Sequence, residues 1–243
     1  MIEILLLIGL VVFVTHTLEA VTGFGCTVLA FPFVVLLMKD LEQAKIILSI
    51  LAWALAVYFA CTKYRQINRK QFGIILLFAG IGLPAGMILF KNADAALLTR
   101  ALGVFIVLSA AVQLYKCFVP GKANRKTPAL AGYAFLLAGG VVHGAFAIGG
   151  PLIVLYAAER IPDKGQFRAT MCLLWTALNT VLITHYFFEN RLTVQTGRDL
   201  SVLLPFLIAG IVAGEMIHNK VSELLFKKIV FTSLLLVGVA VII

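Results

Sequence analysis

The sequence predicts an all-α fold: a polytopic membrane protein of two inverted repeats, each a broken re-entrant helix hairpin followed by three transmembrane helices. Three observations lead to this prediction: the composition, the length of the uncharged runs and a weak internal repeat. Of the 243 residues, 62% are hydrophobic and 13% are charged, whereas a soluble domain has about 45–50% apolar and about 25% charged residues. The mean hydropathy is +1.05. No soluble domain can therefore be separated from the rest of the chain.

Long uncharged runs lie between bunched charges, in the order 20–38, 46–62, 72–90, 101–115, 128–158, 169–188, 200–214 and 229–243. A helix needs about 20 mostly apolar residues to cross the hydrocarbon. Several runs reach that length, and the shorter ones reach it when Lys or Arg at their ends snorkel. An apolar stretch over 4–18 precedes the first run. Because it has no basic region before it and no cleavage site after it, we expect a retained helix and not a signal peptide.

Two patterns occur twice in the chain. Asp40, Gln43 and Lys45 match Asp163, Gln166 and Arg168 in type and spacing. The glycine pairs of Ala79-Gly80-Ile81 and Ala85-Gly86-Met87 recur, two residues closer together, in Ala209-Gly210-Ile211 and Ala213-Gly214-Glu215. We predict a first transmembrane repeat over 1–118, a basic linker over 119–127 and a second transmembrane repeat over 128–243. Gly80, Gly82, Gly86, Gly210 and Gly214 are expected to permit close helix packing.

The first segment of each repeat is broken by glycines, at 23–25 and at 149–151. Each is either a kinked crossing or a hairpin that returns to the same side. Basic residues gather on the cytoplasmic side of membrane proteins. If both segments cross, ten of the twenty Lys and Arg lie on each face of the membrane. If both are hairpins, fourteen lie on one face and six on the other. We therefore predict hairpins, which makes the second repeat upside down relative to the first, as in many secondary transporters, with both termini outside the cytoplasm.

The two hairpin tips predict a shared anion site. A tip near the membrane midplane exposes the first turn of its returning half-helix, with unpaired N–H groups and the positive end of the helix dipole. Glycines let an anion approach that backbone closely. The predicted binding residues at the tips are Thr22, Gly23, Phe24, Gly25 and Cys26 in the first repeat and His143, Ile148, Gly149, Gly150 and Pro151 in the second.

The motifs at the tips resemble a known family. The sequence GFGCTVLAFP over 23–32, followed by Gln43-Ala44-Lys45, is similar to the first glycine-rich motif of the TauE/SafE sulfite exporter family, also called the TSUP or toluene sulfonate uptake permease superfamily. HGAFAIGGPLIVLY over 143–156 resembles its second motif, and FRATMCLLW over 167–175 with Asn179 resembles the helix that follows. Family members often carry a third glycine where this chain has Cys26. The resemblance covers essentially the whole chain.

This resemblance implies secondary transport without ATP, with export as the expected direction. The implied substrate is a small sulfur-containing anion such as sulfite, sulfoacetate or another organosulfonate, carried by alternating access in the inner (plasma) membrane. An anion channel is the alternative, and only a carrier would show counterflow. The expected partners are the anion and the lipid bilayer. A homodimer is kept open, although no residue argues for it.

Five polar residues have two interpretations each. Glu19 lies where a carboxylate is costly, so it either carries a coupling proton or braces the loop, or it lies near an aqueous mouth. His16, like His143, is either a packing histidine or a proton or anion contact. Arg168 is either a snorkelling anchor or a forked donor to the substrate. Asn179, about 16 Å further along the same helix, fits binding or a helix–helix hydrogen bond. Trp53 and Trp175 are expected to pack helices or line the cavity.

Other classes of protein are disfavoured. The net charge of +9 is attributed to cytoplasmic loops and not to nucleic-acid binding. The four cysteines, Cys26, Cys61, Cys117 and Cys172, show no pairwise spacing, so no metal, cofactor or disulfide is expected. The sequence has no His-Glu-x-x-His, no Gly-x-Ser-x-Gly and no paired aspartates in its apolar segments, and we do not expect an enzyme.

Overall fold

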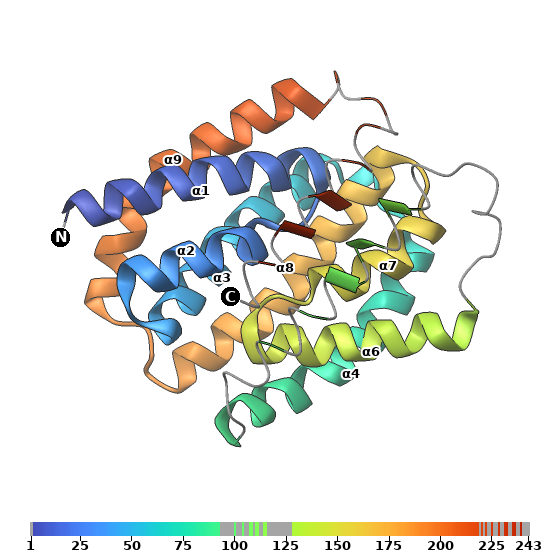
Figure 1. The fold of residues 1–243 in the computed structure, drawn as a ribbon, viewed down its shortest axis with the longest axis horizontal. Helices are drawn as coiled ribbons and strands as arrows, with labels where there is room; N and C mark the ends of the chain where they lie inside the picture. Colours follow the sequence, from blue (N-terminus) through green and yellow to red (C-terminus); the bar gives the residue numbers. More distant parts are fainter. Residues whose placement is uncertain are drawn as a thin grey trace. The chain divides into compact units, whose positions relative to one another are not determined.

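A computed structural model describes residues 2–92 and 128–218, together with separate positions within 100–115 and 220–239 (Figure 1). The runs predicted to cross the membrane over 101–115 and 229–243 fall largely outside the described residues. The predicted linker over 119–127 and Cys117 lie wholly outside them.

Every regular element in the described ranges is a helix, which confirms the all-α fold class. The elements are α1 (Ile2–Thr22), α2 (Cys26–Met38), α3 (Leu41–Thr62), a 3₁₀ helix η1 (Tyr64–Gln66), α4 (Arg69–Asn92), α6 (Ala129–Phe146), α7 (Gly150–Arg160), α8 (Lys164–Phe188) and α9 (Val194–His218). Among the described helices six are long and apolar enough to cross a membrane, namely α1, α3, α4, α6, α8 and α9.

The repeated Asp-x-x-Gln pattern is a helix start. The Asp40 carboxylate accepts a hydrogen bond of 3.0 Å from the backbone N–H of Gln43 at the start of α3. Asp163 accepts one of 2.7 Å from the N–H of Gln166 at the start of α8. An aspartate that caps the first turn in this way satisfies a donor that the helix itself leaves free. The two patterns therefore recur because each begins the helix that follows a hairpin.

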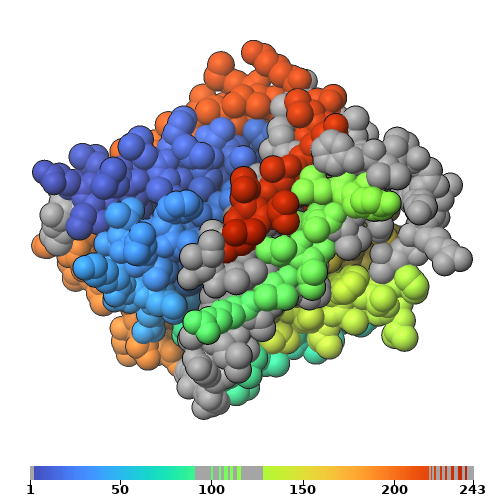
Figure 2. Space-filling model, in the orientation of Figure 1, coloured from blue at the N-terminus to red at the C-terminus, as the bar shows by residue number. Residues whose placement is uncertain are grey.

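Apolar side chains cover the outside of the protein, and polar ones lie within it. α1 and α2 form part of the surface in Figure 2, and they expose Leu10, Val14, Phe33 and Leu36. Glu19, three residues before the end of α1, is by contrast only 3% exposed. A soluble protein would have the reverse arrangement, so this distribution fits helices surrounded by lipid.

The chain forms two compact units, residues 1–72 with 168–220 and residues 73–167 with 221–243. Each unit combines segments from both predicted repeats, and each is described by itself. The predicted repeat boundaries rest on sequence similarity and stay a prediction.

In the first unit, α1 and α9 lie side by side and run in the same direction (Figure 1). Gly210 lies against Phe13, and one turn further along α9 Gly214 lies against Thr17 and Ala20. A Cβ on Gly210 would lie 3.0 Å from the carbonyl oxygen of Phe13. Glycine at these positions therefore lets the two backbones approach closely.

In the second unit, α4 and α6 also run in the same direction. Gly82 faces the carbonyl oxygen of Leu137, and Gly86 faces that of Val141. Two glycines of α6 contact the backbone of α4 in return. The contact between α4 and α6 therefore uses the same close approach as the contact between α1 and α9.

These contacts test the expectation that the glycines permit close packing. Gly82 and Gly86 are four residues apart, as are Gly210 and Gly214, and the expectation that these four permit close packing is confirmed. Within the described part of the chain the same expectation for Gly80 is wrong, because no described atom lies within 4 Å of a Cβ placed there. A spacing of four residues is therefore shared by the close contacts at Gly82 and Gly86 and at Gly210 and Gly214, and the alignment of the repeats stays a prediction.

Both broken segments fold back on themselves as hairpins. The first turn of α1 and the last turn of α2 line the same cavity, so these two helices run antiparallel. In the second unit Gly132 faces Tyr156 and Gly139 faces Ile153, so α7 runs back along α6. The limbs are unequal: α1 and α6 are long enough to cross a membrane, whereas α2 has 13 residues and α7 has 11. The inverted orientation of the two repeats stays a prediction.

One matched pair of substitutions tests the packing of α4. We expect Gly86→Ala to destabilise the protein by several kcal/mol, because its Cβ would overlap the carbonyl oxygen of Val141 and overpacking alone costs about 1–3 kcal/mol. Gly80→Ala on the same helix should be neutral or stabilise by up to about 1 kcal/mol. Thermal unfolding in detergent measures both, and equal effects would contradict the assigned contact.

Candidate functional site

The first helix break consists of three residues between α1 and α2. Gly23 has a φ of 87° and Gly25 a φ of 105°, and such values favour glycine. A Cβ on Gly23 would lie 2.7 Å from Cα of Arg168, whereas nothing lies within 4 Å of a Cβ on Gly25. The break is therefore packed tightly against α8 at Gly23 and has open space beside Gly25.

Side chains from α8 and α9 satisfy the backbone carbonyls at the end of α1. Arg168 Nη1 donates to Ala20 O at 2.9 Å, and Trp175 Nε1 donates to Gly23 O at 2.8 Å. His218 Nδ1 donates to Val21 O at 2.8 Å. The last carbonyls of a helix have no partner within the helix. Buried backbone of this kind would be unstable without these three donors.

A carboxylate of the protein occupies the N-terminus of α2. Glu19 Oε2 accepts a hydrogen bond of 2.8 Å from the backbone N–H of Cys26, the first residue of α2. Both residues are buried. Thr22 Oγ1 donates to Phe24 O at 2.8 Å and closes the turn between them. Of the interpretations made for Glu19, the geometry shows the hydrogen bond that braces the loop.

Arg168 is buried beside the break, with 4% of its surface exposed. Its guanidinium carbon lies 4.7 Å from the centre of the Phe59 ring. Nη1 bonds Ala20, but Nε is buried and has no hydrogen-bond partner. The interpretation of Arg168 as a snorkelling anchor is therefore wrong, because its head group lies inside the first unit. A spare donor on a buried cation is available to a further acceptor.

The second helix break has the same local design with different residues. Ala147, with a φ of 59°, follows α6 and donates its N–H to His143 O at 2.7 Å. The N–H of Gly149 donates to His143 Nδ1 at 3.4 Å, and Pro151 lies in the first turn of α7. A Cβ on Gly149 would collide with the carbonyl oxygen of Gly139. Gly149 is thus required for the closure of the hairpin itself.

Glu19 and His143 occupy equivalent positions. Each lies four residues before a residue of positive φ, Gly23 or Ala147, and each accepts that residue's N–H through its backbone oxygen. Each side chain then bonds a backbone N–H near the start of the returning helix. The sequence pattern had paired His16 with His143 instead. His16 lies nearly one turn before Glu19, fully buried, with Nδ1 donating to Val12 O at 2.9 Å and Nε2 without a partner.

The predicted site residues fall into two groups. Around the first break lie Thr22, Gly23, Phe24, Gly25, Cys26, Glu19 and Arg168, and around the second lie His143, Ile148, Gly149, Gly150 and Pro151. Asn179 is buried in α8, 2% exposed, further along the helix than Arg168. Sequence reasoning missed the contact of His218 with the break, and it expected Trp175 to pack helices or line the cavity, not to bond the backbone of the break. Trp175 lies two turns after Arg168 on one face of α8, and this spacing was the available signal.

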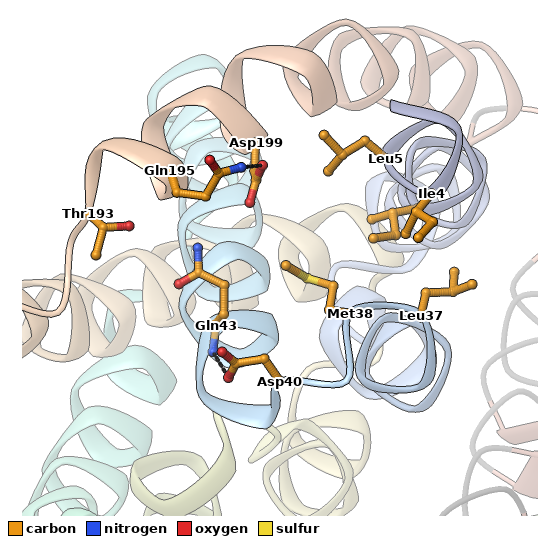
Figure 3. A pocket seen from close by; sticks show the side chains of 10 residues that line it. Ile4, Leu5, Leu37, Met38, Asp40, Gln43, Thr193, Gln195 and Asp199 are labelled. Atoms are coloured by element: carbon orange, nitrogen blue, oxygen red, sulfur yellow. Dashed lines mark hydrogen bonds between the residues drawn. The ribbon is translucent and has the colours of Figure 1, made fainter. Parts of the chain in front are cut away.

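A cavity of about 450 Å³ opens at the other end of the first hairpin (Figure 3). Its apolar wall comes from α1 and α2, and its polar wall comes from Asp40 and Gln43 of α3 and from the start of α9. Asp199 of that wall is 4% exposed and accepts from Gln195 Nε2 at 2.7 Å. The ten lining residues include two carboxylates and no basic side chain. This cavity was not predicted, and it is less suited to an anion than the break is.

The six long apolar helices, the exposed apolar surface and the buried polar breaks define a polytopic membrane protein. The chain belongs to the sulfite exporter TauE/SafE family, whose family model matches residues 7–241. It is accordingly a membrane transporter of a family that carries sulfite and related sulfur anions. No curated protein and no solved structure matches the chain.

The two tryptophans provide a test of the break. Trp175→Phe should destabilise the protein by about 1–3 kcal/mol, because the buried carbonyl of Gly23 loses its donor. Trp53→Phe is the matched control, since Trp53 Nε1 donates to an exposed Thr180 hydroxyl that water can also satisfy. Thermal unfolding followed by circular dichroism compares the two, and an equal or smaller loss for Trp175→Phe would contradict the role given to it.

Proposed function

We propose that the protein is a secondary transporter that exports a small sulfur-containing anion, such as sulfite, sulfoacetate or another organosulfonate, across the inner (plasma) membrane by alternating access. The family membership supports the class of substrate. The first helix break supports the place of binding, with Thr22, Phe24, Cys26 and Arg168 around the two glycines. His143, Ile148, Gly149, Gly150 and Pro151 at the second break, and Asn179, remain candidates for contact with the anion.

One observation carries the proposal: the break already binds an oxyanion, the carboxylate of Glu19 on the N–H of Cys26. Sulfite and sulfonates present oxygen acceptors of the same kind to a helix N-terminus. Open space beside Gly25 gives room for such a group. The unpartnered Nε of Arg168 offers a cationic donor next to the same break, and guanidinium groups suit oxyanions well.

The length of α2 supports a site deep in the membrane. Its 13 residues span about 20 Å at 1.5 Å per residue. The hydrocarbon core is about 30 Å thick. We propose that this hairpin enters the membrane at the cavity end, so that its break lies about 20 Å from that surface, where an unpaired anion would be unstable and needs the donors described above.

Flux measurements test the proposal and distinguish a carrier from a channel. Proteoliposomes loaded with unlabelled sulfite should transiently accumulate ³⁵S-sulfite from outside, because a carrier exchanges one anion for another. Sulfoacetate and methanesulfonate, tested in the same way, define the substrate range, and empty liposomes are the control. Uptake that is absent for all three anions would overturn the proposal. Rapid flux without counterflow would favour the anion channel, and nothing in the described residues supports the homodimer that the sequence left open.

Arg168→Lys should weaken the apparent affinity for the transported anion about tenfold or more. Lysine keeps the charge but loses the forked donors, and a hydrogen bond to a charged group is worth about 1.5–3 kcal/mol. Arg191→Lys is the matched control, because Arg191 pairs with Glu42 at 3.1 Å on the surface and is about half exposed. The KM for sulfite counterflow measures both, and an unchanged KM in folded Arg168→Lys would remove Arg168 from the site.

A further inference from the structure

We propose that Glu19 is a tethered competitor for the transported anion, so that each anion bound at the first break takes up one proton on Glu19. This inference rests on the proposed function and adds the coupling ion to it. Its starting point is that the N–H of Cys26 is already used by the carboxylate of Glu19.

The carboxylate and a substrate anion exclude each other at this place. One backbone N–H bonds Glu19 Oε2 at 2.8 Å, and the Cys26 side chain bonds the same carboxyl group. Glu19 is 3% exposed and Cys26 is fully buried. Two negative charges next to each other in such a dry environment repel strongly. An anion can therefore take this position only after Glu19 has become neutral or has moved away.

A second observation shows that the break can hold more than Glu19. Arg168 is also buried, and its Nε has no hydrogen-bond partner among the residues that the structure describes. Its Cα packs against Gly23, so that it borders the break directly. A Cβ placed on Gly25, in the same three-residue turn, would meet no described atom within 4 Å. The buried guanidinium therefore has a donor available to an oxyanion that binds at this turn.

The surroundings leave protonation as the way to neutralise Glu19. No Lys, Arg or His in the described part of the chain forms an ion pair with it. Glu215 of α9 is already engaged by Lys63 at 2.9 Å. The titratable and charged groups on the helices packed against this region are His16 on α1, Cys26 on α2, Lys45 and Tyr58 on α3, Arg168 and Cys172 on α8, and Glu215 and His218 on α9.

The resulting step is balanced in charge and protons. A proton binds the Glu19 carboxylate, which then gives up the N–H of Cys26, and the incoming anion accepts that N–H in its place. For a monovalent sulfonate, the proton and the anion that bind together carry no net charge. The step is reversible, so the same linkage serves export whenever the outward anion gradient exceeds the opposing proton gradient. His16, nearly one turn earlier on α1 with a free Nε2, is the neighbouring group that could pass this proton.

Proton uptake on binding tests this inference directly. Methanesulfonate is the probe, because it has no group that titrates near neutral pH, so any proton taken up is bound by the protein. Calorimetric titration of the purified wild-type protein, repeated at rising pH in pairs of buffers of different ionisation enthalpy, should approach one proton per anion once Glu19 is ionised before the anion binds. Since the protonated form binds, the affinity should fall about tenfold per unit of rising pH while Glu19 is ionised.

Two variants give the expected contrast. Glu19→Gln should bind methanesulfonate without proton uptake and with a flat pH profile, because the amide oxygen can still accept from Cys26 but carries no charge. Glu215→Gln is the matched control, because it removes a carboxylate paired with Lys63 and should leave the proton count unchanged. A role of Glu19 in bracing alone would give no proton uptake in any of the three proteins.

The outcomes separate this inference from the proposed function. Binding of methanesulfonate to the wild type without proton uptake would overturn the competition and leave the anion site standing. Proton uptake that persists in Glu19→Gln would also overturn the competition and leave the anion site standing. Failure of methanesulfonate and sulfite to bind any of the proteins would overturn the proposed function, and this inference with it. The wild-type count decides the question even where Glu19→Gln does not fold.

Discussion

Backbone groups in the bilayer must find partners within the protein, and the first helix break depends on this constraint. The chain leaves its helix at Gly23, so the carbonyls before it lose their usual donors. Arg168, Trp175 and His218 replace those donors from two other helices. The break can therefore exist only where α8 and α9 stand beside it. Its geometry is a property of the packed unit and not of the hairpin alone.

Glycine contacts let pairs of parallel helices lie close together in each unit. α9 lies against α1 through Gly210 and Gly214, and α4 lies against α6 through Gly82 and Gly86. Each compact unit thus presents a hairpin limb to one parallel helix by the same close approach of backbones. This close approach occurs in both units. It also places His218 at the level of the first break, because the α9 helix follows α1 to its end.

The two breaks differ in the charge that faces the returning helix. A carboxylate reaches the backbone of α2, and an imidazole reaches that of α7. A carboxylate fills an anion position when ionised and frees it when protonated, whereas a neutral imidazole does not compete by charge. The two breaks therefore share one local design but place different titratable groups beside the returning helix. The cavity at the far end of the first hairpin differs from the break in charge. Its lining includes two carboxylates and no basic side chain, so it does not favour an anion.

The sequence by itself determined the membrane class, the all-α fold, the two broken segments and the family. These properties depend on local features, because hydropathy sets where a helix can cross and glycine or proline sets where it breaks. The tertiary structure alone decided that Arg168 is buried, that Glu19 bonds Cys26, and that Glu19 and not His16 corresponds to His143. The burial of Arg168 depends on which distant segments lie beside it, and the bonds of Glu19 and His143 depend on how the backbone turns at each break. Neither the identity of a residue nor its spacing along the chain contains that information.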